Sequence, residues 1–172
     1  MKTLADWLTP VRATGMAAYL VAASSCGVAW VTAGRNKGLS RLALILGILQ
    51  TALFVDMAFD WRWRLYDLLR GQAMVNQWYN HRHWPQIGML ALLAALLLTA
   101  IRVARRRFSS SPGAVLAVEG ALLSIGCWST EVISLHATDA LLYHRIGPLM
   151  IVNFVWALAS LITVIGIWKA SG

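Results

Sequence analysis

The sequence has little charge for its length. Only 13% of its 172 residues are Asp, Glu, Lys or Arg, whereas 59% are apolar, and the mean hydropathy is +0.63. Soluble domains carry about 25% charged and roughly 45–50% apolar residues. A soluble chain this short could not bury so much apolar surface, so the composition predicts a membrane protein. The length fits a single domain over residues 1–172.

Acidic residues, cysteines and catalytic motifs are also scarce. The 15 Lys and Arg residues outnumber the 7 Asp and Glu residues, but these cations gather between apolar runs. That pattern indicates membrane topology and contact with lipid headgroups, and no nucleic-acid partner is expected. The two cysteines, Cys26 and Cys127, lie inside apolar runs, which argues against a disulfide framework or a cysteine zinc site. No H-E-x-x-H motif or phosphate-binding glycine loop occurs.

Five apolar runs are long enough to cross about 30 Å of hydrocarbon as helices. They cover residues 13–33, 40–59, 86–104, 113–137 and 147–168. Pro85 and Pro148 fit the first turns of the third and fifth of these helices. The predicted fold is therefore all-α, a polytopic membrane bundle of about five transmembrane helices.

The connection over residues 60–84 differs from the other loops because it is rich in tryptophan. Its apolar side chains recur at helical spacing, and Arg62, Arg64 and Asp67 lie away from them. This pattern is typical of an amphipathic helix in the headgroup layer, where tryptophan rings also prefer to lie. We expect an interfacial segment here, acting either as an aromatic belt or as a cover over a site.

The positively charged connections predict the orientation in the membrane. Residues 34–41 and 102–112 are rich in Arg and Lys, whereas residues 138–146 hold only Arg145. Short cation-rich loops remain on the cytoplasmic side. The sequence therefore predicts a multi-pass protein of a bacterial inner membrane, with the N-terminus outside and the C-terminus cytoplasmic. The arginines within residues 60–84 count against this orientation.

Two of the predicted helices carry stripes of small residues. The stripe of the first helix is Gly15, Ala18, Ala22, Ser25, Ala29 and Thr32. The stripe of the fourth is Gly113, Ala117, Gly120, Ser124, Cys127, Glu131, Ser134 and Thr138. In lipid, such stripes allow helices to approach closely. We expect these two faces to pack on protein, either on each other or on a partner subunit such as a second copy.

Acids and histidines gather at the predicted outer ends of the second and fourth helices. The candidate catalytic residues are Asp56, Asp60, Glu131, His136 and Asp139. The candidate ligands of a divalent metal are His136, Asp139, His81 and His83. An ionisable group at membrane depth is costly, so Glu131 is a functional candidate by default. Histidine and carboxylate together are suitable ligands for zinc, iron or manganese.

Four interpretations of this acid–histidine cluster are open. In the first, which is structural, the cluster pairs with Arg62, Arg64, Arg82 and Arg145. The second is a divalent metal site. The third is general acid–base catalysis by Glu131 or Asp139. The fourth is movement of protons or ions along the fourth helix through Glu119, Glu131 and His136.

Two functions are consistent with these features. The first is an accessory, assembly or oligomeric component of a membrane complex, which the small-residue stripes and the lack of a soluble domain favour. The alternative is a membrane-embedded enzyme, or a proton- or ion-coupled transport protein, that uses the cluster at the outer, periplasmic-side face. In both cases the expected partners are lipid and other membrane helices.

Overall fold

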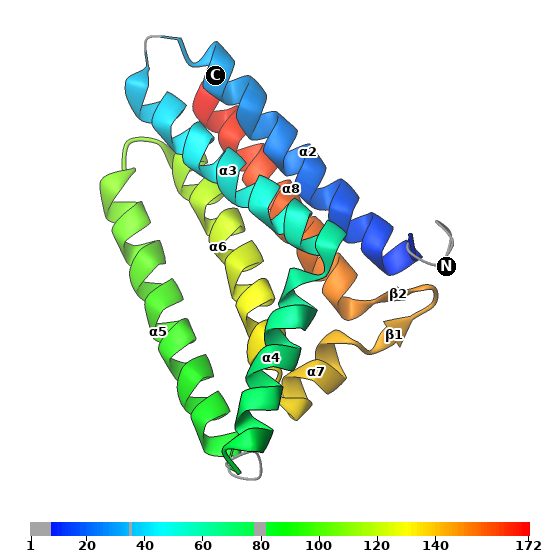
Figure 1. The fold of residues 1–172 in the computed structure, drawn as a ribbon. Helices are drawn as coiled ribbons and strands as arrows, with labels where there is room; N and C mark the ends of the chain where they lie inside the picture. Colours follow the sequence, from blue (N-terminus) through cyan, green and yellow to red (C-terminus); the bar gives the residue numbers. More distant parts are fainter. Residues whose placement is uncertain (1–7, 35, 78–81) are drawn as a thin grey trace.

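The computed structural model describes residues 8–34, 36–77 and 82–172. Its helices are α2 (Pro10–Thr32), α3 (Lys37–Phe59), α4 (Trp61–Val75), α5 (His83–Arg107), α6 (Pro112–Ile133), α7 (His136–Leu142) and α8 (Ile151–Ser171) (Figure 1). A short antiparallel hairpin of β1 (Arg145–Ile146) and β2 (Leu149–Met150) precedes α8. Within the described residues, five helices are long and apolar enough to cross a membrane: α2, α3, α5, α6 and α8. This confirms the predicted all-α membrane bundle.

Local sequence signals account for several helix starts. Thr9, Asn36 and Ser111 each accept a hydrogen bond from a backbone N–H in the first turn of α2, α3 or α6. Such N-caps satisfy donors that the helix leaves without a partner. Pro10 and Pro112 begin α2 and α6, where a missing N–H costs nothing.

Two predicted helix ends are wrong. The fourth predicted helix ends at Ile133 instead of residue 137, because Ser134 adopts a left-handed conformation with φ 50°. Residues 136–142 consequently form the separate helix α7. Pro148 does not begin the last helix but lies in the hairpin turn beside Gly147, whose φ of 64° suits glycine. The last helix instead begins at Ile151.

Helix α8 holds the bundle together, because it packs most extensively on α6 and also on α2. Glycine permits the close approach to α6. A Cβ atom on Gly120 would lie 2.5 Å from the backbone nitrogen of Thr163, and one on Gly166 would lie 2.2 Å from that of Ala117. The small-residue stripe of α6 is therefore covered by α8, and the buried face of α2 packs on α3 and α8. Both stripes therefore pack mainly on helices of the same chain, but they do not pack on each other.

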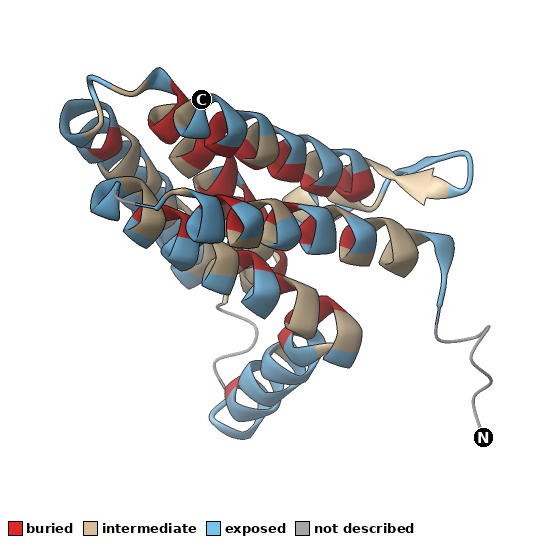
Figure 2. Cartoon of the chain, turned by 90° about the horizontal axis from the view of Figure 1, so that it is seen from above, coloured by how far each residue is buried: buried red, intermediate tan, exposed pale blue. Residues whose placement is uncertain are grey.

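The core has two parts along the bundle. The first, which we call the apolar plug, consists of Cys26, Ala29, Leu42, Ala43, Leu46, Ala114, Ala117, Ala121 and Ile167. The second contains Tyr19, Leu53, Met57, Cys127, Val152 and Trp156. Figure 1 shows that α4, α7 and the hairpin lie at the end of the second part, opposite the chain's C-terminus. Buried residues follow the facing sides of the helices in Figure 2, and the outward sides are exposed.

Helix α4 leaves α3 at Asp60, whose left-handed φ of 56° interrupts the helix. Its exposed apolar side chains include Trp61, Leu65, Leu68 and Leu69. Arg62 is only 4% exposed, because it points into the bundle. The predicted amphipathic segment is therefore present as the helix over residues 61–75, in which Arg62 points inward whereas Arg64, Asp67 and Arg70 are exposed.

Candidate functional site

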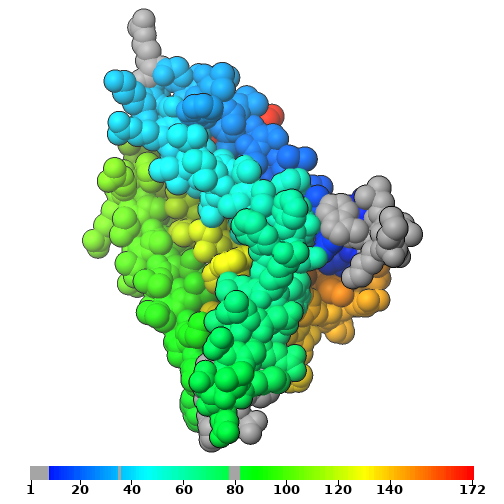
Figure 3. Space-filling model, viewed as in Figure 1, coloured from blue at the N-terminus to red at the C-terminus, as the bar shows by residue number. Residues whose placement is uncertain are grey.

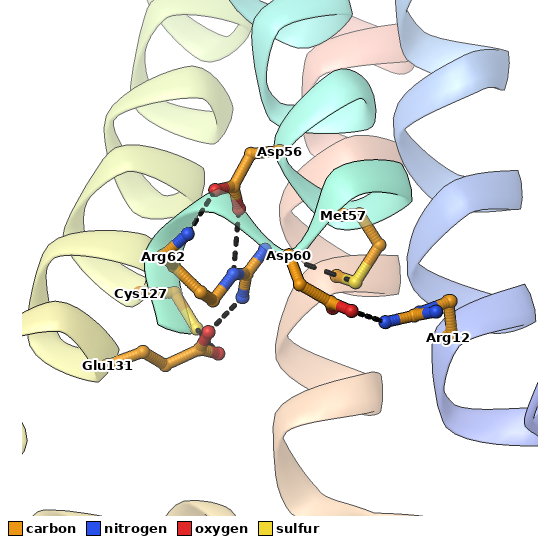
Figure 4. Close-up of polar contacts among 7 residues, drawn as sticks. All are labelled: Arg12, Asp56, Met57, Asp60, Arg62, Cys127 and Glu131. Atoms are coloured by element: carbon orange, nitrogen blue, oxygen red, sulfur yellow. Dashed lines mark hydrogen bonds and ion pairs between the residues drawn. The ribbon is translucent and has the colours of Figure 1, made fainter. Parts of the chain in front are cut away.

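Arg62 forms a buried cluster of ion pairs with α3 and α6 (Figure 4). Its backbone N–H donates to Asp56 Oδ1 at 2.8 Å, and its Nε donates to Asp56 Oδ2 at 2.7 Å. Its Nη1 donates to Glu131 Oε2. The side chains of Arg62, Asp56 and Glu131 are 4%, 7% and 1% exposed. Arg62 thus pairs with two of the predicted catalytic candidates, as the structural interpretation requires.

This cluster is neither balanced in charge nor saturated in hydrogen bonds. One guanidinium faces two carboxylates, and an uncompensated buried charge is costly. Arginine has five N–H donors, yet among the described residues Nη2 reaches only Met57 Sδ, a weak acceptor at 4.0 Å. Burial by itself would lower the pKa of Arg62, but Glu131 and Asp56 raise this pKa above its ordinary value. The guanidinium therefore stays charged and keeps donor capacity for a further partner.

A second ion pair lies closer to the surface. Arg12 of α2 pairs with Asp60 at the junction of α3 and α4, and their side chains are 16% and 42% exposed. Next to it, Asn153 Nδ2 of α8 donates to the Val11 carbonyl oxygen at 2.8 Å. These contacts tie the start of α2 to α3 and α8 at one end of the bundle.

A cavity of about 590 Å³ opens beside both ion pairs, and we call it the Arg62 cavity. Its charged lining residues are Arg12, Asp60, Arg62, Glu131 and Arg145, and its aromatic ones are Trp63, Tyr143 and Trp156. Ligand sites commonly have volumes of about 300–1,000 Å³ and combine apolar walls with a few polar groups. Because the lining comes from α2, α3, α4, α6, α8 and the hairpin region, only the folded bundle creates this cavity.

Two aromatic groups in the cavity wall carry buried polar atoms. Within the described residues, the Tyr143 hydroxyl makes no hydrogen bond. Burial raises the pKa of Tyr143, and the carboxylate of Glu131 raises it further, so the hydroxyl stays protonated and can donate. Among the same residues, the indole N–H of Trp156 also has no hydrogen-bond partner. The Arg62 guanidinium lies over the Trp156 ring, 5.4 Å from its centroid.

The predicted histidine candidates that the structure describes lie in a different pocket, of about 320 Å³, which we call the histidine pocket. His83, His136 and Asp139 line it together with Arg82. Asp139 Oδ2 accepts a hydrogen bond from Ser134 Oγ at 2.6 Å, and Oδ1 has no hydrogen-bond partner in the described part of the chain. The structure therefore divides the predicted acid–histidine cluster into an acid–arginine site and a histidine pocket.

The structure also bears on the metal-site and proton-path interpretations of the acid–histidine cluster. Over residues 8–34, 36–77 and 82–172, no group of three or more His, Cys, Asp or Glu residues is arranged to hold a metal ion. His81 lies outside the described residues, so the predicted metal site stays a prediction. Glu119 pairs with Arg105 of α5 at 2.7 Å, and His136 belongs to α7. The proposed proton path therefore does not run along one helix.

Sequence reasoning did not identify Arg12, Tyr143 or Trp156 as residues of this site. A usable signal was Asn153, a polar residue inside the last apolar run, since polar groups at membrane depth usually have a partner. No protein family, curated protein or solved structure shows a significant match to this chain.

Proposed function

We propose that this multi-pass membrane protein binds a small polar molecule in the Arg62 cavity, at the periplasmic end of the bundle. The observation that carries the proposal is a buried guanidinium with spare donors in the wall of a cavity of ligand size. Evolved binding sites place a few polar groups in a largely apolar wall in this manner. A purely structural ion pair needs no cavity beside it.

The lining suggests which ligand chemistry is accepted. Arg62 and the Tyr143 hydroxyl offer hydrogen-bond donors, and Arg145 lies exposed at the rim without an ion pair among the described residues. Carboxylate and phosphate oxygens accept such bonds, and charge-assisted bonds are the stronger kind. The aromatic rings of Trp63 and Trp156 suit an apolar part of the ligand. A small carboxylate- or phosphate-bearing molecule therefore fits the cavity.

Access from one side supports binding over passage through the bundle. The apolar plug fills the half of the bundle opposite the cavity. The cation-rich connections also lie at the plug end, where α3 begins at Lys37 and α5 ends at Arg107. The positive-inside rule therefore supports the proposal that the plug faces the cytoplasm and the cavity faces the periplasm of an inner membrane. The N-terminus is then outside and the C-terminus inside.

The candidate residues take separate roles in this proposal. Asp56 and Glu131 hold Arg62 in position, and Asp60 holds Arg12 at the mouth. Glu131 lines the cavity itself, so it is the group placed to exchange a proton with a ligand if the protein is an enzyme. His136 and Asp139 have no part in this site.

Native mass spectrometry of the protein purified in mild detergent tests the proposal. The wild type should retain a small molecule, and Arg145→Gln should lower its occupancy about tenfold, because a charge-assisted hydrogen bond is lost. Arg64→Gln is the matched control, since Arg64 is an exposed arginine outside the cavity. A folded wild type that retains no such molecule, or equal occupancy in both variants, would contradict the proposal.

A second candidate function, an accessory or assembly subunit of a membrane complex, is favoured by α5. Within this fully described helix only Ala104 is buried, and its main contact is α6. A partner helix or a second copy of the chain could cover the remaining face. Chemical crosslinking in native membranes tests this candidate: a defined crosslinked complex through a cysteine at Leu96 supports it, and a monomer alone contradicts it.

A further inference from the structure

We infer that the space between α4, α5 and α6 binds one anionic phospholipid from the bilayer. Its phosphate would lie at the histidine pocket, and part of one acyl chain would lie in an adjoining apolar crevice. This site is separate from the Arg62 cavity, because none of the described lining residues is shared between them. The inference therefore does not depend on the function proposed above.

Polar and apolar spaces adjoin at this site. The crevice measures about 170 Å³ and shares Tyr66, Arg82 and Gln86 with the histidine pocket. Its apolar walls are Leu69, Ala73, Pro85, Met89, Val132 and Ile133. Figure 3 shows α4 and α5 on either side of α6, whose surface is visible between them. A ligand with a polar head and an apolar tail can occupy both spaces at once.

The charges of the lining favour an anionic head group. Arg70 and Arg82 line the crevice, His83 and His136 line the pocket, and Asp139 is the single acid among the described lining residues. The two arginines outnumber the one aspartate, so the described lining carries an excess of positive charge. Arginine is well suited to phosphate because it donates two parallel hydrogen bonds.

The nearby helix ends also favour an anion. The carbonyl oxygens at the C-terminus of α6 would repel a phosphate, but Gln86 Nε2 donates to those of Ile133 and Ser134, each at 3.1 Å. These two acceptors are therefore already occupied. The pocket also adjoins the first turn of α5, which begins at His83, and the positive end of a helix dipole stabilises a nearby anion.

The position of the site suits a lipid better than a soluble anion. Trp84, next to the pocket, is 76% exposed, and tryptophan prefers the membrane–water boundary. In the crevice, Leu69 and Met89 are 45% and 50% exposed, so the crevice is open to the surroundings of α4 and α5. A lipid can place its phosphate at the boundary and its chain along these residues, whereas free phosphate would leave the crevice unfilled.

The lipid preference of the full-length wild type gives the first test. Delipidated protein in detergent is titrated with phosphatidylglycerol or with phosphatidylcholine of the same chain length, and bound lipid is counted by native mass spectrometry. We expect one phosphatidylglycerol to be retained, with at least about tenfold preference over phosphatidylcholine. Equal retention of the two lipids would overturn the inference, and this comparison requires no variant.

Three variants then locate the lipid and its source. Arg70→Gln combined with Arg82→Gln should abolish the preference, Ala73→Trp should weaken retention by filling the crevice, and Arg64→Gln should change neither. Circular dichroism verifies that each variant is folded. Millimolar inorganic phosphate is the competing probe for a soluble anion and should not displace the lipid. Displacement by phosphate, or an unchanged preference in the folded double variant, would refute the site.

Discussion

Replacing Arg62 with methionine tests the buried cluster most directly. Methionine keeps much of the apolar length of the side chain but removes its charge. Asp56 and Glu131, at 7% and 1% side-chain exposure, would then have no cation between them. The backbone N–H of residue 62 could still donate to Asp56, whereas Glu131 would lose its ion-pair partner.

The expected loss of stability is large. Removing one partner of a buried ion pair costs about 3–5 kcal/mol, because a charge remains buried and uncompensated. For a chain of this size, 1 kcal/mol corresponds to about 2–4 °C, so Tm should fall by roughly 6–20 °C. The triple variant Asp56→Asn, Arg62→Met and Glu131→Gln removes every charge of the cluster. It should regain most of this loss, since neutral polar groups cost less to bury than carboxylates.

Thermal unfolding in detergent micelles, followed by circular dichroism, measures both effects. Arg64→Met is the control, because Arg64 is an exposed arginine two positions along the same helix and a surface change should shift Tm by less than about 2 °C. An Arg62→Met variant that unfolds at the wild-type temperature would refute the reasoning. So would a triple variant less stable than Arg62→Met alone.

Three further predictions follow from packing and exposure. Gly120→Ala should lower the free energy of unfolding by about 1–3 kcal/mol, because the added Cβ would overlap the α8 backbone. The control Gly27→Ala places its Cβ in open space and should leave Tm unchanged or higher. Equal Tm values for the two variants would contradict the α6–α8 contact. Cys26 and Cys127 should react with maleimide only after denaturation, because both are buried; fast labelling of the native protein would disprove this burial. Arg105→Gln should cost less than about 1 kcal/mol because the arginine is 66% exposed, and a Tm drop above about 4 °C would show that its ion pair matters more.

The sequence predicted several residues of the site, but it did not predict which of them come into contact. Glu131 stood out because an ionisable group at membrane depth is costly, and Asp56 because it lies at the predicted outer end of the second helix. The structure brings both to Arg62. His136 was grouped with them because it lies at the predicted outer end of the fourth helix, but in the structure it lines a separate pocket. The difference arises at Ser134, where a left-handed turn ends α6 and redirects the chain into α7. Hydropathy gives no indication of such a turn, so the fourth helix was predicted to continue beyond its actual end at Ile133.

Arg62 is a second residue whose contacts the sequence did not predict. Its place on the polar face of α4 was predicted, but that face was expected to meet the headgroup layer. In the structure the Arg62 side chain alone points into the bundle, where it pairs with Asp56 and Glu131. The other charged residues of α4, Arg64, Asp67 and Arg70, are exposed. The sequence pattern around an arginine in an amphipathic helix is the same whether its side chain meets water, lipid headgroups or two buried carboxylates.

The sequence alone was enough to predict the five apolar helices, the amphipathic helix that follows the second of them, and the placement of Asp56 and Glu131 at one end of the bundle. These features depend on hydropathy, length and spacing along the chain, which are local properties. The tertiary structure alone decided that α8 covers the stripe of α6, that Arg62 joins α3 to α6, and that a cavity opens beside them. Such features depend on which residues distant in sequence come into contact, and many pairings of helix faces satisfy the same pattern.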